Sequence, residues 1–270
     1  MGHPAVNDAV VAGEALSHEL LTAQLLTNYH SWIFREVKPF LGRQLTEIGG
    51  GLGTFSELLL RHHVARTSDS SLEIFEPCEN LYAKLRAKCL AEHSELMCGN
   101  RLRVTNGCFT WQPNGYDSAV LINVLEHVRD DSNLIHTIYA SLHPGGTLIV
   151  FSPALPCLFS ALDQRVGHFR RYRKADLASL FRRAGFDTVR IRYMDVAGIL
   201  PWYVINTVGG SCSFNPQWIR MYDRFVVPIM SRIERYGAPI GKNLLMVGRK
   251  PTRSGSSPGT AETPLTHTAC

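Results

Sequence analysis

The sequence has 270 residues, of which 45% are hydrophobic, so it is long enough and apolar enough to bury the core of one large domain. Lys and Arg number 28 against 23 Asp and Glu, and this small surplus, spread along the chain, argues against a nucleic-acid partner. The first residues lack the charged start and apolar run of a signal peptide, which predicts a cytoplasmic protein. The most apolar segment, 196–208, is too short to cross a bilayer, so we expect no transmembrane segment.

Short apolar runs alternate with segments of helical periodicity along most of the chain. Residues 1–12 and 251–270 are rich in small and polar residues, so we predict disorder at both ends and one domain over 13–250. The predicted strands are 44–48, 72–75, 102–105, 118–122, 147–151, 188–193 and 243–247. The predicted helices are 15–27, 31–40, 54–63, 79–92, 131–142 and 175–184. This alternation favours an α/β fold, a parallel doubly wound sheet with helices on both faces.

A long segment, 195–241, separates the last two predicted strands. It contains several aromatic residues and two predicted helices, one of them at 217–235. A long insertion that joins two strands is a natural lid or substrate-binding element. We therefore expect a helical lid over 195–241.

The segment EIGGGLG at 47–53 follows a predicted strand and precedes a predicted helix. Glycines are needed where a ligand lies against the backbone and where a turn requires conformations that a Cβ disfavours. The following helix offers free N–H groups to a carboxylate or phosphate. The dinucleotide fingerprint GxGxxG is incomplete, because Ser56 stands where a third glycine would follow Gly51 and Gly53.

Two acidic residues end neighbouring predicted strands, Glu47 at the first and Glu76 just after the second. A carboxylate at Glu47 would repel a pyrophosphate but attract the ammonium group of an amino acid. Glu76 is placed to accept hydrogen bonds from both hydroxyls of a ribose. The alternatives are a surface charge at Glu47 and a helix cap at Glu76, but the order and spacing of the two favour a nucleoside site.

The string at 47–53 resembles the ExGxGxG signature of class I S-adenosylmethionine-dependent methyltransferases. FEP at 75–77, LINVLEHV at 121–128 and HPGGTL at 143–148 look like the later motifs of this family in the correct order. The resemblance covers about residues 25–195 and the final strand. It implies a Rossmann-like seven-stranded sheet in the order 3-2-1-4-5-7-6, with the last strand antiparallel, and direct in-line transfer of a methyl group.

The resemblance also implies the residues that bind S-adenosylmethionine. Glu47 and the glycines would line the methionine end, Glu76 would hold the ribose, and Asn123 would lie beside the sulfonium. Tyr29 resembles the tyrosine that many members place over the cofactor from the preceding helix. The predicted cofactor-binding residues are Tyr29, Glu47, Gly49, Gly51, Gly53, Glu76, Pro77, Cys108, Phe109 and Asn123.

One motif departs from the family pattern. The usual Gly-Asp pair after the third strand, whose aspartate bonds the adenine amino group, is replaced by Gly107 and Cys108. Adenine recognition therefore falls to backbone atoms at Cys108, to Phe109 or to another residue.

Two histidines are candidates for the general base that a hydroxyl acceptor requires. His127 follows the fourth strand at the carboxyl edge of the sheet, and imidazole titrates near neutral pH. The alternative for His127 is a backbone-bonded residue at the start of a helix. His168 lies in the loop predicted after the fifth strand. The seven cysteines show no CxxC pair and no zinc-type spacing, so no metal is expected.

The segment GHFRRY at 167–172, with Asp163 before it, resembles an acceptor-site segment of many bacterial small-molecule methyltransferases. Paired arginines suit a carboxylate or phosphate, which makes Arg170, Arg171 and Tyr172 candidate substrate-binding residues. The alternatives are a solvated lead-in to the next helix, or an internal pair between Asp163 and an arginine.

These observations predict methyl transfer to a small-molecule acceptor, with oxygen favoured over nitrogen or carbon. The acceptor would be partly apolar, with an anionic group that the paired arginines could bind, and drawn from secondary metabolism or from lipid or quinone precursors. The alternatives are an NAD-dependent oxidoreductase, opposed by Glu47, and a non-catalytic nucleoside-binding protein. Methylation of nucleic acid or protein is opposed by the modest charge. The sequence does not indicate an oligomeric state.

Overall fold

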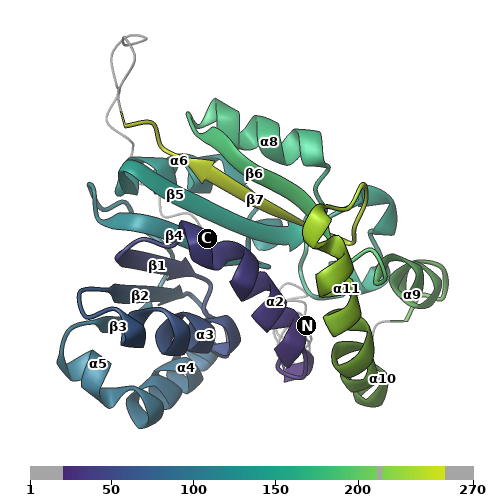
Figure 1. The fold of residues 1–270 in the computed structure, drawn as a ribbon, viewed down its shortest axis with the longest axis horizontal. Coiled ribbons are helices and arrows are strands. Elements are labelled where there is room, and N and C mark those ends of the chain that lie inside the picture. The colour runs from purple at the N-terminus through teal and green to yellow at the C-terminus, as the bar shows by residue number, and fades with distance from the viewer. Residues whose placement is uncertain (1–20, 212–214, 253–270) are drawn as a thin grey trace, which may run out of the picture.

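A seven-stranded sheet with the order β3-β2-β1-β4-β5-β7-β6 carries the fold (Figure 1). The structure is a computed structural model that describes residues 21–211 and 215–252. Adjacent strands pair in parallel except at β7, which runs antiparallel to both β5 and β6. The strands are β1 (Gln44–Ile48), β2 (Ser71–Glu76), β3 (Leu102–Asn106), β4 (Tyr116–Ile122), β5 (Leu142–Pro153), β6 (Asp187–Met194) and β7 (Asn243–Arg249). The predicted sheet order and the antiparallel last strand are confirmed.

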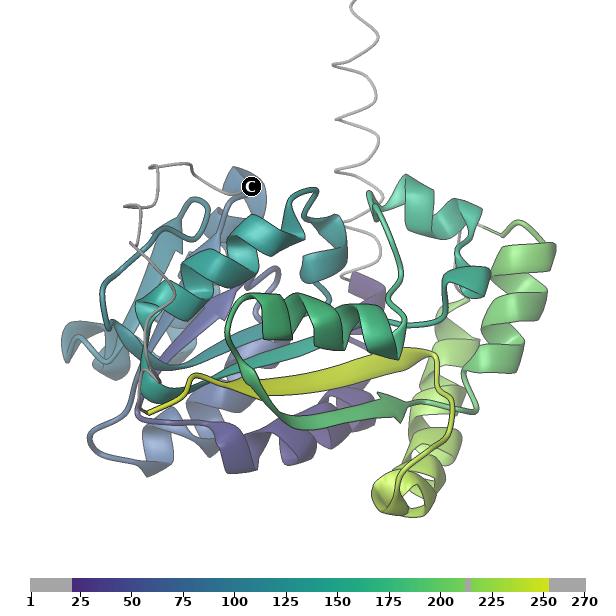
Figure 2. The ribbon, with the colours of Figure 1, turned by 90° about the horizontal axis from the view of Figure 1, so that it is seen from above.

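Helices cover both faces of this sheet, as Figures 1 and 2 show. One face packs against α2, α3 and α4 through side chains such as Trp32 and Leu59. The other packs against α6 and α8 through Ile138 and Phe181. Because both faces are covered, the 148–151 run of β5 is apolar and buried without alternation. The helices are α2 (Thr27–Val37), α3 (Thr54–His62), α4 (Glu79–Glu92), α5 (Ser94–Cys98), α6 (Asp131–Ser141), α7 (Ala161–Arg165), α8 (Lys174–Arg183), α9 (Ile199–Trp202), α10 (Pro216–Met221) and α11 (Val227–Ile233).

Helix α2 differs from its prediction, which placed a break between 27 and 31. The backbone N–H groups of Asn28 and Tyr29 donate to the carboxylate of Asp223, which lies far away in the chain. These groups lack partners within the helix, so a remote carboxylate can satisfy them and start the helix early. The part of the predicted helix 15–27 that precedes residue 21, and the predicted disorder at 1–12 and 253–270, lie outside the described residues.

The segment between β6 and β7, which we call the insertion (residues 195–241), is helical as predicted. Residues 216–236 form one continuous helix, in which the π-helical η6 (Tyr222–Val226) joins α10 to α11 and the 3-10 turn η7 (Glu234–Tyr236) ends it. A second π-helical segment, η5 (Tyr203–Val208), follows α9. Glu234 anchors the long helix, because its carboxylate accepts the N–H groups of Asp195 and Val196.

Helix α7 was predicted as loop. It begins with a capping box, in which the Ser160 hydroxyl accepts the N–H of Asp163 while the Asp163 carboxylate accepts the N–H of Ser160. The strand β5 also begins earlier than predicted, at Leu142, because the N–H of Gly145 donates to the carbonyl of Lys250 and keeps residues 143–146 in the strand.

Candidate functional site

The glycine turn lies directly after β1, as predicted. Gly49, Gly51 and Gly53 have φ angles of 77°, 56° and 75°, in the left-handed region that favours glycine. The N–H of Gly49 donates to the carbonyl of Phe75 (2.8 Å), which ties the turn to β2. A Cβ on Gly49 would lie 2.5 Å from Cγ2 of Val124. The turn is therefore closed to larger residues by both conformation and packing.

Glu47 carries a buried carboxylate immediately before this turn. The residue is 2% exposed, and its Oε2 has no hydrogen-bond partner. Burial raises the pKa of Glu47 to about 8, and the nearby charge of Glu76 adds to the shift. A buried carboxyl oxygen without a partner is costly unless a ligand completes it. An ammonium group from a bound amino acid would supply both the charge and the donors.

Glu76 closes the turn from the end of β2. Its Oε2 accepts the N–H of Gly51 (2.7 Å) and its Oε1 accepts the N–H of Cys78 (2.9 Å). Burial raises the pKa of Glu76, while these two hydrogen bonds oppose the shift. Each carboxylate oxygen keeps a second lone pair for a ribose hydroxyl. Because Cys78 is the N-cap residue of α4, the hydrogen bond to its N–H also gives Glu76 a capping contact with that helix, the alternative considered from the sequence.

Asn123 and Pro77 lie at the rim of the same edge. Asn123 follows β4 with φ of 53°, a conformation that asparagine tolerates better than most residues. Its N–H donates to the carbonyl of Phe151, and its side chain is exposed. Pro77 is exposed beside Glu76. Both side chains are open to a ligand that lies on the glycine turn.

Tyr29 and Phe109, two of the predicted cofactor-binding residues, are both buried. Tyr29 is 6% exposed, and its hydroxyl bonds the carboxylate of Asp195 and the side chain of Asn243. Phe109 is 2% exposed and packs edge-to-face on Phe75 in the core. A contact of either ring with the cofactor stays a prediction. The half-buried Cys108 next to Phe109 stays close to Glu76, because the N–H of Gly107 donates to the Glu76 carbonyl.

The two histidines lie together at the carboxyl edge. His127 ends the turn η3 (Leu125–His127) after β4, and its ring is perpendicular to that of His168, with 4.5 Å between the centroids. Burial lowers the pKa of His127 to about 3, and the neighbouring His168 adds to this effect. His127 is therefore neutral at pH 7 and only a weak base.

His168 is held by a buried aspartate. Its Nδ1 lies 2.8 Å from Oδ1 of Asp163, and Asp163 is fully buried. Burial alone would raise the pKa of Asp163, but hydrogen bonds from His168 and Arg171 lower it below its usual value. An imidazole whose Nδ1–H donates to a carboxylate has Nε2 as its basic nitrogen, and the carboxylate stabilises the imidazolium that forms.

The paired arginines are engaged within the protein. Arg171 donates to Asp163 from Nε (3.0 Å), its side chain is 1% exposed, and its guanidinium stacks on Trp202. Arg170 bonds Asp131, which also accepts the hydroxyl of Tyr172. The internal pair between Asp163 and an arginine, one of the sequence alternatives, is therefore present. The charges of Arg170 and Arg171 are thus compensated within the protein, and their role in binding an acceptor stays a prediction.

Sequence reasoning missed Asp195, which joins the insertion to the sheet. It is fully buried with φ of 68°, and it accepts from Tyr29, from Tyr222 and from Nζ of Lys242 (3.0 Å). Its position directly after β6, three residues before Gly198, is the signal that could have identified it.

The geometry also offers a metal-binding possibility that the sequence did not predict. Glu126, His127 and His168 each present one ligand atom, and these atoms lie within 4.8 Å of one another. A carboxylate and two imidazoles suit several divalent transition metals. A second such group in the described residues, Glu57, Glu92 and His93, lies on the surface between α3 and α4.

Comparisons with known proteins agree on the fold. A family model described as "Methyltransferase domain" matches residues 26–191. No curated protein matches the sequence. One similar solved structure is phosphoethanolamine N-methyltransferase 2 of Haemonchus contortus in complex with S-adenosyl-L-methionine, with a TM-score of 0.54 and 16% identity over 80% of this chain and 51% of that one. Another is an S-adenosylmethionine-dependent methyltransferase of Mesorhizobium loti, with a TM-score of 0.52 and 16% identity over 80% of this chain and 95% of that one. A third similar structure is a SAM-dependent methyltransferase of Thermotoga maritima, with a TM-score of 0.53 and 17% identity over 86% of this chain and 95% of that one.

Within the described residues, no helix is both long enough and apolar enough to span a membrane.

Proposed function

Because this chain belongs to the class I S-adenosylmethionine-dependent methyltransferases, we propose that it methylates a hydroxyl group of a small-molecule acceptor. Its cofactor is S-adenosylmethionine, and the family excludes the alternative of an NAD-dependent oxidoreductase. We keep the pathway, secondary metabolism or lipid or quinone precursors, and the cytoplasmic location as predictions.

The residues around the glycine turn fit this cofactor. Glu47 would pair with its ammonium group, Glu76 would accept from its ribose, and Asn123 would lie at its methyl end. The orphaned Oε2 of Glu47 supports this placement, because it lacks a partner that the ammonium would provide. When bound, S-adenosylmethionine supplies a methyl group on a sulfonium, and transfer then depends on alignment of the acceptor and on exclusion of water.

His168 is the residue that we assign as general base. The single observation that carries this assignment is the 2.8 Å contact between Nδ1 of His168 and Asp163. With Nδ1–H donating to this carboxylate, Nε2 would be the nitrogen that takes the acceptor proton, in the manner of the aspartate and histidine of hydrolase triads. His168 is 8% exposed, so its surroundings are largely dry.

His127 would have a different role. The low pKa of His127 makes it a poor acceptor of protons, so it would stay uncharged next to His168, which would take the proton of the acceptor. The side chain of Val124 lies against Gly49, where it leaves no room for a Cβ, and Val124 stands three residues before His127 in the chain. This connection would place the histidine pair beside the methyl end of the cofactor. We propose that His127 positions the acceptor.

The acceptor would be partly apolar rather than anionic. Arg170, Arg171 and Lys242 are paired with Asp131, Asp163 and Asp195, which leaves their charges compensated. Trp202 from the insertion stacks on both Arg171 and Lys242. We propose that the Trp202 ring also packs against an aromatic acceptor.

Acceptor screening tests this proposal. The protein is incubated with S-adenosylmethionine and matched phenols, alcohols, carboxylates and amines, and S-adenosylhomocysteine formation and product mass are measured. Turnover confined to hydroxyl acceptors is expected. Methylation of an amine, a peptide or a nucleic acid alone would contradict the proposed acceptor class while leaving the methyltransferase assignment intact.

With such an acceptor, His168→Ala should lower kcat by about a hundredfold or more, because general-base catalysis typically contributes that much. His127→Ala should lower it by about tenfold. Neither change should alter the affinity for S-adenosylmethionine. His136→Ala is the matched control, because His136 is exposed and bonds only the Ser132 carbonyl of its own helix. Equal pH–rate profiles for His168→Ala and wild type would remove His168 from proton transfer.

A further inference from the structure

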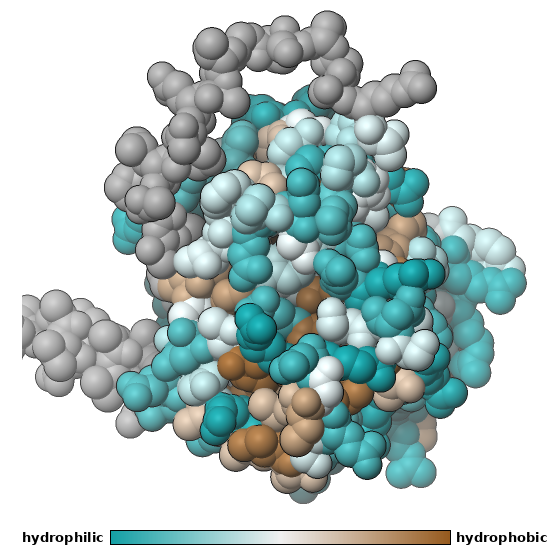
Figure 3. Space-filling view, turned by 90° about the vertical axis from the view of Figure 1, so that its left-hand side faces the viewer, coloured by the Kyte–Doolittle hydropathy of each residue, from teal (hydrophilic) through white to brown (hydrophobic). Residues whose placement is uncertain are grey.

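The insertion concentrates exposed apolar side chains. Twelve of the seventeen exposed large hydrophobic residues in the described chain lie in it, and the other five are scattered. Figure 3 shows the side of the molecule turned away from the insertion, where hydrophilic residues cover most of the surface and apolar ones form small groups. An apolar concentration of this kind marks an interaction surface.

The long helix at 216–236 carries an apolar stripe on its exposed side. The stripe runs along about 27 Å of helix at 1.5 Å per residue. Two aromatic residues mark its ends, Trp218 at 69% exposure and Tyr236 at 82%. The opposite side of the same helix is buried through Asp223, Val227 and Glu234. The stripe residues are Trp218, Met221, Phe225, Ile229, Ile233 and Tyr236.

The charges of the insertion have one sign on the surface. Its three acidic residues, Asp195, Asp223 and Glu234, are at most 4% exposed and accept backbone N–H groups. Its basic residues are four exposed arginines, Arg220, Arg224, Arg232 and Arg235. Helix α9 and segment η5 carry no charge and expose Leu200, Val204, Ile205 and Val208. The insertion thus exposes an apolar stripe next to positive charges, with no exposed negative charge. Such a surface is complementary to one that has negative groups on the outside and apolar groups beneath them.

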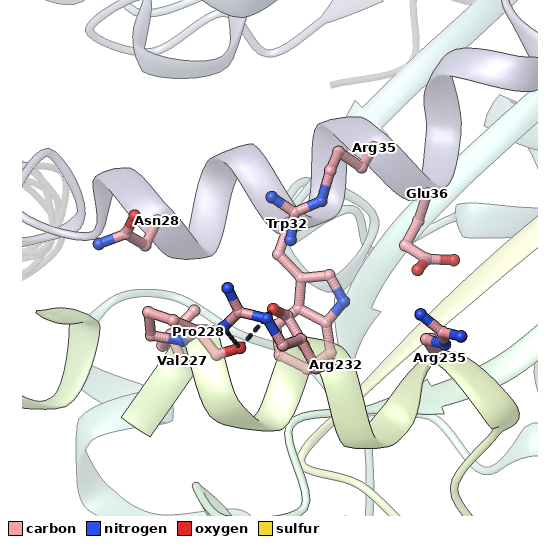
Figure 4. A pocket seen from close by; sticks show the side chains of 9 residues that line it. Asn28, Trp32, Arg35, Glu36, Val227, Pro228, Arg232 and Arg235 are labelled. Atoms are coloured by element: carbon pink, nitrogen blue, oxygen red, sulfur yellow. Dashed lines mark hydrogen bonds between the residues drawn. The ribbon is translucent and has the colours of Figure 1, made fainter. Parts of the chain in front are cut away.

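A groove of about 430 Å³ lies along one flank of this helix, between α2 and α11 (Figure 4). Three exposed arginines line it, Arg35 from α2, Arg232 from α11 and Arg235 from η7. Glu36 also lines it, but its carboxylate is already paired with Arg190 (2.8 Å) and Arg192 (2.9 Å) of β6. The groove therefore keeps a positive excess that suits a phosphate group.

We infer that the insertion docks this protein on the surface of an anionic phospholipid bilayer. The stripe lies flat among the acyl chains near the headgroups, and the arginine groove takes headgroup phosphates. Interfacial helices combine an apolar face containing Trp, Phe or Leu with a basic flank, and they lie in the membrane plane rather than across it. A protein partner with a neutral apolar surface would leave the four arginines unpaired.

Flotation with lipid vesicles tests this inference. The vesicles contain either phosphatidylcholine alone or phosphatidylcholine with about one third phosphatidylglycerol, a fraction that gives a strongly negative surface. The wild type should float with the anionic vesicles, its bound fraction should fall in high salt, and Trp218 fluorescence should shift to shorter wavelength.

Two double variants separate the contributions. Phe225→Ser with Ile229→Ser removes the centre of the stripe, and Arg232→Gln with Arg235→Gln removes the groove charge. Each should weaken vesicle affinity by about tenfold or more, which is at least 1.4 kcal/mol. The controls are Leu90→Ser on α4 and Arg103→Gln on β3, which are exposed elsewhere. All variants should bind S-adenosylmethionine as the wild type does, which shows that they are folded.

Three results would overturn the inference. The wild type could fail to float with either vesicle type. Both double variants could bind the anionic vesicles as strongly as the wild type does. It could form a dimer by light scattering that Phe225→Ser with Ile229→Ser converts to monomer without any vesicle binding, in which case a second copy of the chain covers the stripe.

Discussion

Replacing Asp163 by alanine should lower the free energy of unfolding by about 3–5 kcal/mol, the usual effect of removing one partner of a buried ion pair. The Asp163 carboxylate is fully buried and accepts hydrogen bonds from Ser160, His168 and Arg171. Its loss leaves the guanidinium of Arg171, 1% exposed, without a compensating charge. Urea denaturation of the purified variant measures this loss.

A second variant separates the unpaired charge from other effects. Asp163→Ala with Arg171→Met removes both charges, so it should recover a large part of the lost stability. Asp69→Ala breaks the exposed pair with Arg43 and should change stability little. Equal destabilisation by Asp163→Ala and Asp69→Ala would show that the buried network is not formed as described.

Replacing Glu76 by alanine should weaken the affinity for S-adenosylmethionine by about a hundredfold or more, because hydrogen bonds to a charged group contribute about 1.5–3 kcal/mol each. The carboxylate holds Gly51 and Cys78 through their N–H groups and would also accept from the ribose. Its removal therefore loosens the turn and removes the ribose acceptor together. Isothermal titration with S-adenosylmethionine and S-adenosylhomocysteine measures the change.

Glu79→Ala is the matched control, because Glu79 is an exposed acid three residues further along the chain. It should bind the cofactor as the wild type does. Glu76→Gln should be intermediate, because its amide keeps one acceptor oxygen but turns an N–H group toward a backbone donor. An unchanged dissociation constant for Glu76→Ala would place the ribose elsewhere.

Much of the fold could be predicted because its elements are locally determined. The bounds of β1 and α4 are those predicted. Apolar periodicity and turn residues specify such elements without help from distant parts of the chain. The start of α2 and helix α7 were missed for different reasons. The first depends on Asp223, which is remote in sequence, and the second is a short helix whose capping box at Ser160 was not recognised.

The residues of the candidate site also differ in how far their positions and partners could be predicted from the sequence. Glu47, Glu76 and Asn123 could be placed because the carboxyl ends of parallel strands meet at one edge of a sheet. The contact of Tyr29 with Asp195 could not be predicted, because Asp195 is remote in sequence, whereas the pair of Asp163 with Arg171 was one of the alternatives that the sequence offered. A tyrosine or an arginine in a motif is read as a ligand contact until the structure shows which carboxylate binds it.

Proton release on cofactor binding tests most directly the claim that Glu47 receives the ammonium of S-adenosylmethionine. With a pKa of about 8, Glu47 is protonated at pH 6.5, and a neighbouring ammonium should ionise it. Calorimetric titration in two buffers of different ionisation enthalpy should show release of about one proton per S-adenosylmethionine bound. Glu47→Gln should release none and bind more weakly. Binding without proton release, or with equal affinity in Glu47→Gln, would contradict the placement of the cofactor on this turn.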